Sequence, residues 1–137
     1  MAKIYLISCV SQKLTRKAKA KDLYVSTLFR SAYQYARQKS ADKIFILSAK
    51  YGLVKPEEEI EPYDQTLKDM STRQRKEWAQ RVLQALGREC DLQHDHFVIL
   101  AGEKYREFLL PNLKSYEVPL QGLPIGKQIQ FLQRGLK

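Results

Sequence analysis

Three apolar runs recur along the chain, and they constrain the fold more than any other feature. They cover Ile4–Val10, Lys43–Ala49 and His96–Ala101, and each is followed by small or polar residues and then by a helical pattern. Continuous runs of this length, rich in Ile, Val and Phe, are typical of strands buried on both faces. A fourth and shorter candidate, Tyr116–Leu120, contains Pro119, which favours an edge strand or a strand end.

Amphipathic patterns between and after these runs predict four helices. Their approximate bounds are Ser26–Lys39, Thr72–Leu86, Glu103–Leu110 and Pro124–Arg134. Ser71 and Gln74 form a capping box at the start of the second helix, because each side chain can bond the other residue's backbone amide. Gly87 is expected to end that helix, and Pro111 is expected to stop the third.

The alternation of strands and helices predicts an α/β fold with three layers, α/β/α, in which about four mainly parallel strands are flanked by helices. We see no repeat or linker, so we expect residues 1–137 to form a single α/β domain. Ligands of such sheets bind outside the carboxyl ends of the strands, at a topological switch point. The residues that follow each strand are therefore the candidates for function.

Composition limits the partners and the cellular location that we expect for this domain. No stretch approaches the roughly 20 apolar residues that span a bilayer, so we expect no membrane partner. Cys9 and Cys90 do not make the disulfide framework of a secreted protein, which favours a cytoplasmic location. The net charge of 24 − 15 = +9 suits a polyanion such as nucleic acid or a nucleotide, although lysines that only maintain solubility would give the same sum.

The charges are segregated along the sequence. Basic residues crowd the segment before the first helix, at Lys13, Arg16, Lys17, Lys19 and Lys21. Acidic residues gather in 57–64, where Glu57–Glu59 read as a solvated acidic face. A basic loop can track a phosphate backbone, so this segment favours contact with nucleic acid.

The first strand ends in Ser8, Cys9 and, slightly later, Lys13, which could hold a phosphate or the edge of a nucleobase. The segment lacks the glycines of a P-loop or a dinucleotide fingerprint, and both are rejected. Cys9 as a nucleophile would need a base or a positive field, and a buried, inert thiol is the preferred interpretation. Tyr24 could stack on a base, whereas Phe29 is expected to pack on the sheet.

The second strand ends in Ser48-Ala49-Lys50-Tyr51-Gly52, the most informative stretch of the sequence. Gly52 permits a positive φ and a close approach of backbone to a ligand. Lys50 can neutralise a phosphate or act as a base, and Tyr51 can stack or donate a hydrogen bond. The alternative is a turn that only ends the strand, with Tyr51 packed down.

A long loop with two prolines follows and contains Glu61, Tyr63 and Asp64. A connection of this length without structure of its own is frequently functional. Asp64 could be a general base, a sugar ligand or a metal ligand, or it could cap a local turn. After the third strand, Gly102 opens a helix whose amides would face the same edge, close to Tyr105.

His94 and His96 flank Asp95 at the start of the third strand. Alternate side chains of a strand point to opposite faces, so a shared metal site is not expected. We predict no metal site and no cofactor.

Taken together, these motifs resemble a small bacterial, archaeal and phage domain family of unknown function over essentially the whole chain. The residues that carry the resemblance are Ile7-Ser8-Cys9, Lys13, Leu23-Tyr24, Ser26, Phe29, Leu47–Leu53, Glu61–Asp64, Pro119-Leu120, Gly122 and Gly126. That family is distantly similar to the YaaA-like peroxide-stress proteins, which bind DNA, and to the uracil-DNA-glycosylase-like α/β proteins. The resemblance implies an α/β fold and supplies no established reaction.

Three hypotheses follow. The first is an enzyme that acts on a nucleotide, nucleobase or nucleic acid, with N-glycosidic chemistry as the best guess. In it Lys50 and Lys13 bind phosphate, Tyr51 or Tyr24 stacks on the base, and Asp64 activates water or stabilises an oxocarbenium ion. Its other ligand-binding candidates are Ser8, Cys9, Ser48, Gly52, Tyr63, Gly102 and Tyr105. The second is a non-catalytic nucleic-acid-binding protein, and the third is an interaction module, such as a homodimer.

Overall fold

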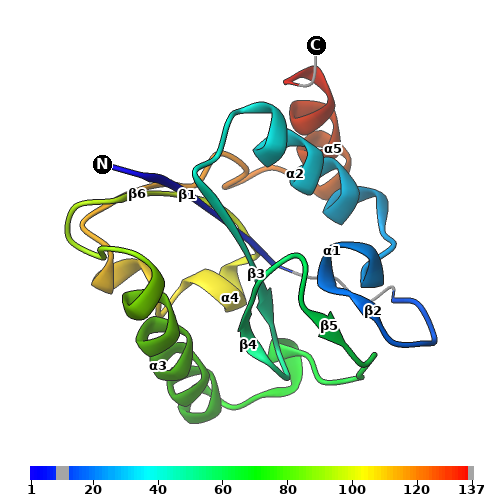
Figure 1. Cartoon of the computed structure of the whole chain (residues 1–137), viewed down its shortest axis with the longest axis horizontal. Helices are drawn as coiled ribbons and strands as arrows, with labels where there is room; N and C mark the ends of the chain where they lie inside the picture. Colours follow the sequence, from blue (N-terminus) through cyan, green and yellow to red (C-terminus); the bar gives the residue numbers. More distant parts are fainter. Residues whose placement is uncertain (9–12, 136–137) are drawn as a thin grey trace.

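The computed structural model describes residues 1–8 and 13–135 and contains a mixed sheet with helices on both faces (Figure 1). The sheet has five strands in the order β4-β3-β1-β6-β7. Their bounds are Lys3–Ser8 for β1, Lys43–Ser48 for β3, Gly52–Val54 for β4, His96–Leu100 for β6 and Ser115–Glu117 for β7. Only β4 is antiparallel to its neighbour in this sheet. The predicted α/β fold class is therefore confirmed.

Two groups of helices cover the sheet. The bounds are Ala20–Leu23 for α1, Thr27–Gln38 for α2, Thr72–Glu89 for α3, Glu103–Arg106 for α4 and Ile125–Arg134 for α5, with short 3₁₀ helices at Leu67–Asp69 (η1) and Leu110–Asn112 (η2). Helices α2 and α5 pack together on one face, whereas α3 and α4 contact each other on the opposite face (Figure 1).

The central strand β1 forms the middle of the core. Its Ile4, Leu6 and Ile7 are fully buried, as expected for a strand covered on both faces. The chain passes from β1 to β3 on one side and later crosses to β6 on the other side of β1. The carboxyl ends of β1 and β6 thus form the topological switch point at which ligands of such folds bind.

The capping box of α3 is confirmed, but its predicted end is wrong. The Gln74 amide donates to Ser71 Oγ over 3.1 Å, and the Ser71 amide donates to Gln74 Oε1 over 2.9 Å. The helix continues through Gly87 to Glu89. Gly87 keeps helical geometry because the buried Leu86 beside it packs into the core and accepts the Cys90 amide at the helix end.

The third predicted helix and the fourth predicted strand are both shorter than expected. Helix α4 ends at Arg106, and the chain continues through turns into η2, which contains Pro111. Strand β7 lies at the edge of the sheet and ends before Pro119. The prediction of an edge strand is confirmed, because the proline lies outside the ladder.

The loop between Pro56 and Leu67 has more structure than its sequence suggested. Residues Glu59–Ile60 form β5, which pairs with β2 (Ala18–Lys19) in a small antiparallel sheet. The strand β4 was also not predicted. It consists of three residues and returns along β3 through the hairpin that Gly52 closes with a φ of 75°, so the expectation of a positive φ at this glycine is confirmed.

The separation of charge along the sequence does not persist in space. The pairing of β2 with β5 brings Glu57 within 3.0 Å of the amines of both Lys19 and Lys21. Hydrogen bonds from Lys21 and then Lys19 lower the pKa of the Glu57 carboxyl. Two of the five cations of the basic segment therefore share one carboxylate within the molecule. No helix in the described part of the chain is long and apolar enough to cross a membrane.

Candidate functional site

Ser8 and Gly102 meet at the carboxyl ends of β1 and β6. The amide of Gly102 donates to Ser8 Oγ over 3.2 Å, although the two residues are 94 positions apart. The guanidinium of Arg106 donates to the carbonyl of Ala101 over 2.9 Å. Ser8 and Gly102, both predicted site residues, therefore lie together at the switch point. Arg106 was not predicted because nothing in the helical pattern of 103–110 distinguishes it.

Ser48, at the end of β3, organises the neighbouring part of this edge. Its side chain is fully buried. Its hydroxyl donates to the Tyr63 hydroxyl over 2.8 Å and accepts the Tyr51 amide over 3.0 Å. The Tyr63 hydroxyl in turn lies 2.7 Å from that of Tyr24. Three segments are thus joined by one buried hydroxyl network, which fixes the turn after β3 relative to the loop before η1.

Trp78 of α3 holds the turn after β3 through a hydrogen bond. Its indole Nε1 donates to the Ser48 carbonyl over 2.9 Å, and its ring contacts Tyr105 edge to face with centroids 5.7 Å apart. A buried tryptophan usually needs a partner for its N–H, and that general rule was the signal for this contact, although it cannot name the partner.

Two lysines flank the tyrosines of this network. The Lys13 amine lies 4.5 Å from the Tyr63 ring centroid, and the Lys50 amine lies 5.2 Å from that of Tyr51. The two rings contact each other edge to face at 5.7 Å. Within the described residues, neither amine has a carboxylate within ion-pair distance, unlike Lys19 and Lys21. We name Lys13, Lys50, Tyr51 and Tyr63 the lysine–tyrosine cluster.

Exposure separates the members of the cluster. The Tyr51 side chain is 37% exposed, whereas Tyr63 is 7% exposed. The Tyr24 ring is only 1% exposed and packs on Phe29 with centroids 5.1 Å apart. Tyr24 therefore presents no open face on which a base could stack, which corrects that expectation, and the predicted packing of Phe29 is confirmed. Of the tyrosines considered for stacking, Tyr51 is the accessible one.

Asp64 follows Tyr63 directly but faces a different feature. It is exposed and lines a shallow groove together with Gln65, Thr66, Asp69, Met70 and Gln74. None of Ser8, Lys50, Tyr51 or Tyr105 lines this groove. Asp64 therefore shares this groove with none of those four candidate residues.

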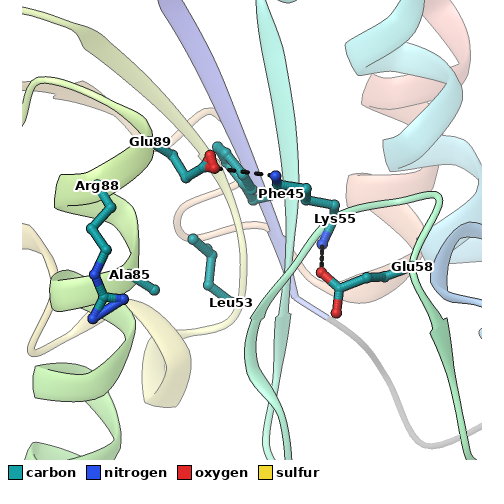
Figure 2. A pocket seen from close by; sticks show the side chains of 7 residues that line it. All are labelled: Phe45, Leu53, Lys55, Glu58, Ala85, Arg88 and Glu89. Carbon is teal, nitrogen blue, oxygen red and sulfur yellow. Dashed lines mark hydrogen bonds and ion pairs between the residues drawn. The ribbon is translucent and has the colours of Figure 1, made fainter.

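A second groove lies between the β3–β4 hairpin and the end of α3 (Figure 2). Phe45, Leu53 and Ala85 provide its apolar lining. The Lys55 amine pairs with Glu89 Oε1 at 3.2 Å, and the Lys55 backbone amide donates to Glu58 Oε1 at 3.2 Å (Figure 2). The Lys55 amine is thus already paired with Glu89, and no predicted site residue lines the groove, so we do not place the functional site there.

The histidines at the other end of β6 bond to protein groups. His96 bonds Ser115 through Nδ1 at 2.6 Å and Glu117 through Nε2 at 2.9 Å, and His94 bonds Asp91. Among the described residues, no three His, Cys, Asp or Glu side chains are grouped to hold a metal ion. Cys9, a predicted ligand-binding residue, lies outside the described residues.

The sheet order and the edge cluster define a three-layer α/β protein whose candidate site follows the carboxyl ends of its parallel strands. The chain belongs to a family of unknown function, DUF6884, whose sequence profile matches residues 4–134. No curated protein and no solved structure matches the chain. Membership agrees with the resemblance to a domain of unknown function and assigns no reaction.

Proposed function

We propose that this protein binds a nucleotide or a nucleic acid at the lysine–tyrosine cluster, with its nucleobase at Tyr51, and hydrolyses the N-glycosidic bond that joins the base to the sugar. One observation carries the proposal: the amines of Lys13 and Lys50 lie over tyrosine rings at the carboxyl edge and, in the described structure, have no carboxylate partner. Ammonium groups without a carboxylate partner are available to an anionic ligand, because no internal ion pair has to be broken first.

The neighbouring aromatic surface supports a ligand that also contains a base. Tyr51 is partly exposed, and its edge-to-face contact with Tyr63 holds the ring in place. Stacking of a base on an aromatic side chain contributes about 1–3 kcal/mol and tolerates any base. Phosphate on Lys50 and a base on Tyr51 would use both groups of one turn, which the Ser48 hydroxyl and the Trp78 indole hold rigidly.

In the catalytic part of the proposal, Asp64 activates water or stabilises the developing oxocarbenium ion. Its support is that Asp64 is exposed and adjacent in the chain to Tyr63, a member of the cluster. The distant resemblance to uracil-DNA-glycosylase-like and YaaA-like proteins belongs to the same proposal, and the mainly parallel sheet is compatible with it.

A second candidate is non-catalytic binding of nucleic acid. It is favoured by the separation of the Asp64 groove from Lys50 and Tyr51, because a catalytic carboxylate must reach the same substrate as the binding groups. In this case the cluster would hold nucleic acid and Asp64 would have no role in chemistry.

Two measurements separate these candidates. A thermal-shift screen against nucleosides, nucleotides and short oligonucleotides should reveal stabilisation that is lost in Lys50→Ala. Release of free base from the ligands that bind should then fall by about 100-fold or more in Asp64→Asn, the size of a general acid–base contribution, while binding persists. Binding without base release would leave only the second candidate, and no stabilisation by any ligand would overturn both.

A further inference from the structure

The basic segment 13–21 divides into two halves with different electrostatic states. Lys19 and Lys21 both pair with Glu57 at 3.0 Å. Arg16 and Lys17 are exposed, and within the described residues neither has an ion-pair partner. The sequence presents these four cations as equivalent, whereas in the structure only the later two share a carboxylate, which offsets one of their two charges. The charge that can act on a partner is therefore concentrated next to Lys13.

The position of Arg16 and Lys17 is fixed from both sides. Before them, Lys13 bridges to Tyr24 and the Leu14 amide donates to the Leu23 carbonyl over 2.8 Å. After them, Ala18 pairs with Ile60 in the small sheet, in the strand β2 that is drawn in blue in Figure 1. At most about 3.5 Å of chain per residue keeps Lys17 within roughly 14 Å of Lys13.

We propose that the ligand of the site is a nucleic-acid strand rather than a free nucleotide, and that Arg16 and Lys17 contact phosphates that flank the bound base. This inference rests on the proposed function of the lysine–tyrosine cluster. Arg16 and Lys17 follow Lys13 by three and four positions and are exposed. A strand carries further phosphates beside the bound nucleotide that these cations can contact, whereas a free nucleotide carries no phosphodiester chain beyond its own phosphate.

The surroundings of this segment do not suit an anionic membrane. Binding at a lipid interface needs large apolar side chains that enter the acyl boundary. None of the exposed large apolar residues in the described part of the chain lies in 13–21. At the start of the segment the Lys13 amine lies over the Tyr63 ring of the cluster, whose accessible ring, Tyr51, suits stacking on a base.

The test compares two double variants that remove the same formal charge. Binding of a fluorescent 12-nucleotide single strand is measured by anisotropy between 50 and 200 mM salt. Arg16→Ala with Lys17→Ala should weaken binding on the order of tenfold near physiological salt and reduce the slope of log K against log salt by about 1.4, since each single-strand phosphate contact contributes about 0.7. Lys19→Ala with Lys21→Ala should change both quantities by less, because the Glu57 carboxylate already offsets one of these two positive charges.

Equal losses in the two variants would overturn the inference, since net charge alone would then account for binding. A nucleoside monophosphate provides the separate control for the proposed function: it should lose affinity in Lys50→Ala and keep it in the Arg16/Lys17 variant. If wild-type protein binds the monophosphate as tightly as the strand, with the same salt slope, the inference fails and the proposed function stands. If vesicles of anionic lipid bind and the strand does not, a membrane replaces the nucleic acid and the inference is overturned.

Discussion

The buried hydroxyl of Ser48 donates to the hydroxyl of Tyr63 over 2.8 Å, although 15 positions separate the two residues. The same serine oxygen accepts the Tyr51 amide. One side chain therefore connects the end of β3, the turn that carries Lys50, and the loop that carries Asp64.

Removal of the Ser48 hydroxyl should destabilise the protein. In Ser48→Ala the Tyr51 amide loses its acceptor and Tyr63 loses a donor in a buried setting. Loss of such partners costs about 1–3 kcal/mol, which urea denaturation would measure as a lower midpoint. Tyr63→Phe removes one hydroxyl of the same network and keeps the ring, so it should be destabilised in the same range. Unchanged midpoints for both variants would show that the network does not stabilise the fold.

Two glycines should respond to alanine in opposite directions. Gly52 has a φ of 75° and would place a Cβ at an ordinary 3.9 Å from Val82, so its substitution is limited by backbone strain alone. The left-handed conformation costs an L-residue roughly 1–2 kcal/mol, and Gly52→Ala should lower the free energy of unfolding by that amount. Gly87 lies inside α3 with open space around it, and Gly87→Ala should raise the free energy by roughly 0.5–1 kcal/mol.

The two glycine variants serve as each other's control in one thermal or urea series. If Gly87→Ala is destabilising, the continuation of α3 beyond Leu86 is contradicted. If Gly52→Ala is neutral, the strained hairpin after β3 is contradicted.

Alkaline pH should reveal the burial of Cys90. Burial raises the pKa of the Cys90 thiol from 9.0 to about 11. The neutral thiol is therefore favoured in the folded state, and its contribution to stability is complete below pH 9 and is lost as the pH rises towards 11. The free energy of unfolding should fall over this window more steeply in the wild type than in Cys90→Ala. Parallel pH profiles of the two proteins would contradict the burial of this thiol.

Much of the fold could be predicted because its signals are local. The runs at Ile4–Val10 and Lys43–Ala49 are apolar on both faces, which indicates parallel strands, and the Ser71–Gln74 capping box marks the start of α3. The end of that helix could not be predicted, because Gly87 tolerates either helix or turn. The packing of Leu86 in the core, which is a tertiary effect, favours the helical conformation at Gly87.

The candidate site was predicted in part for the same reason. The strand-end rule correctly brought Ser8 and Gly102 together across the sheet. It could not indicate that Glu57 pairs with both Lys19 and Lys21, because that contact depends on the pairing of β2 with β5, two strands of two residues each. Nor could it show that Tyr24 is buried, since an aromatic residue after a basic loop can face either way.

The assignment of the ligand site to the lysine–tyrosine cluster is tested most directly by calorimetric titration of a nucleoside monophosphate, and of the matching nucleoside, into four proteins. Wild type should bind the monophosphate, and Lys50→Ala and Lys13→Ala should each weaken its binding on the order of tenfold or more, within the 1.5–3 kcal/mol range of hydrogen bonds to charged groups. Lys39→Ala is the matched control, since Lys39 also lies over a tyrosine ring, at 5.4 Å from Tyr35 on α2, and it should bind as wild type does. Equal affinity of all four proteins for the monophosphate would contradict the assignment of the site to the lysine–tyrosine cluster.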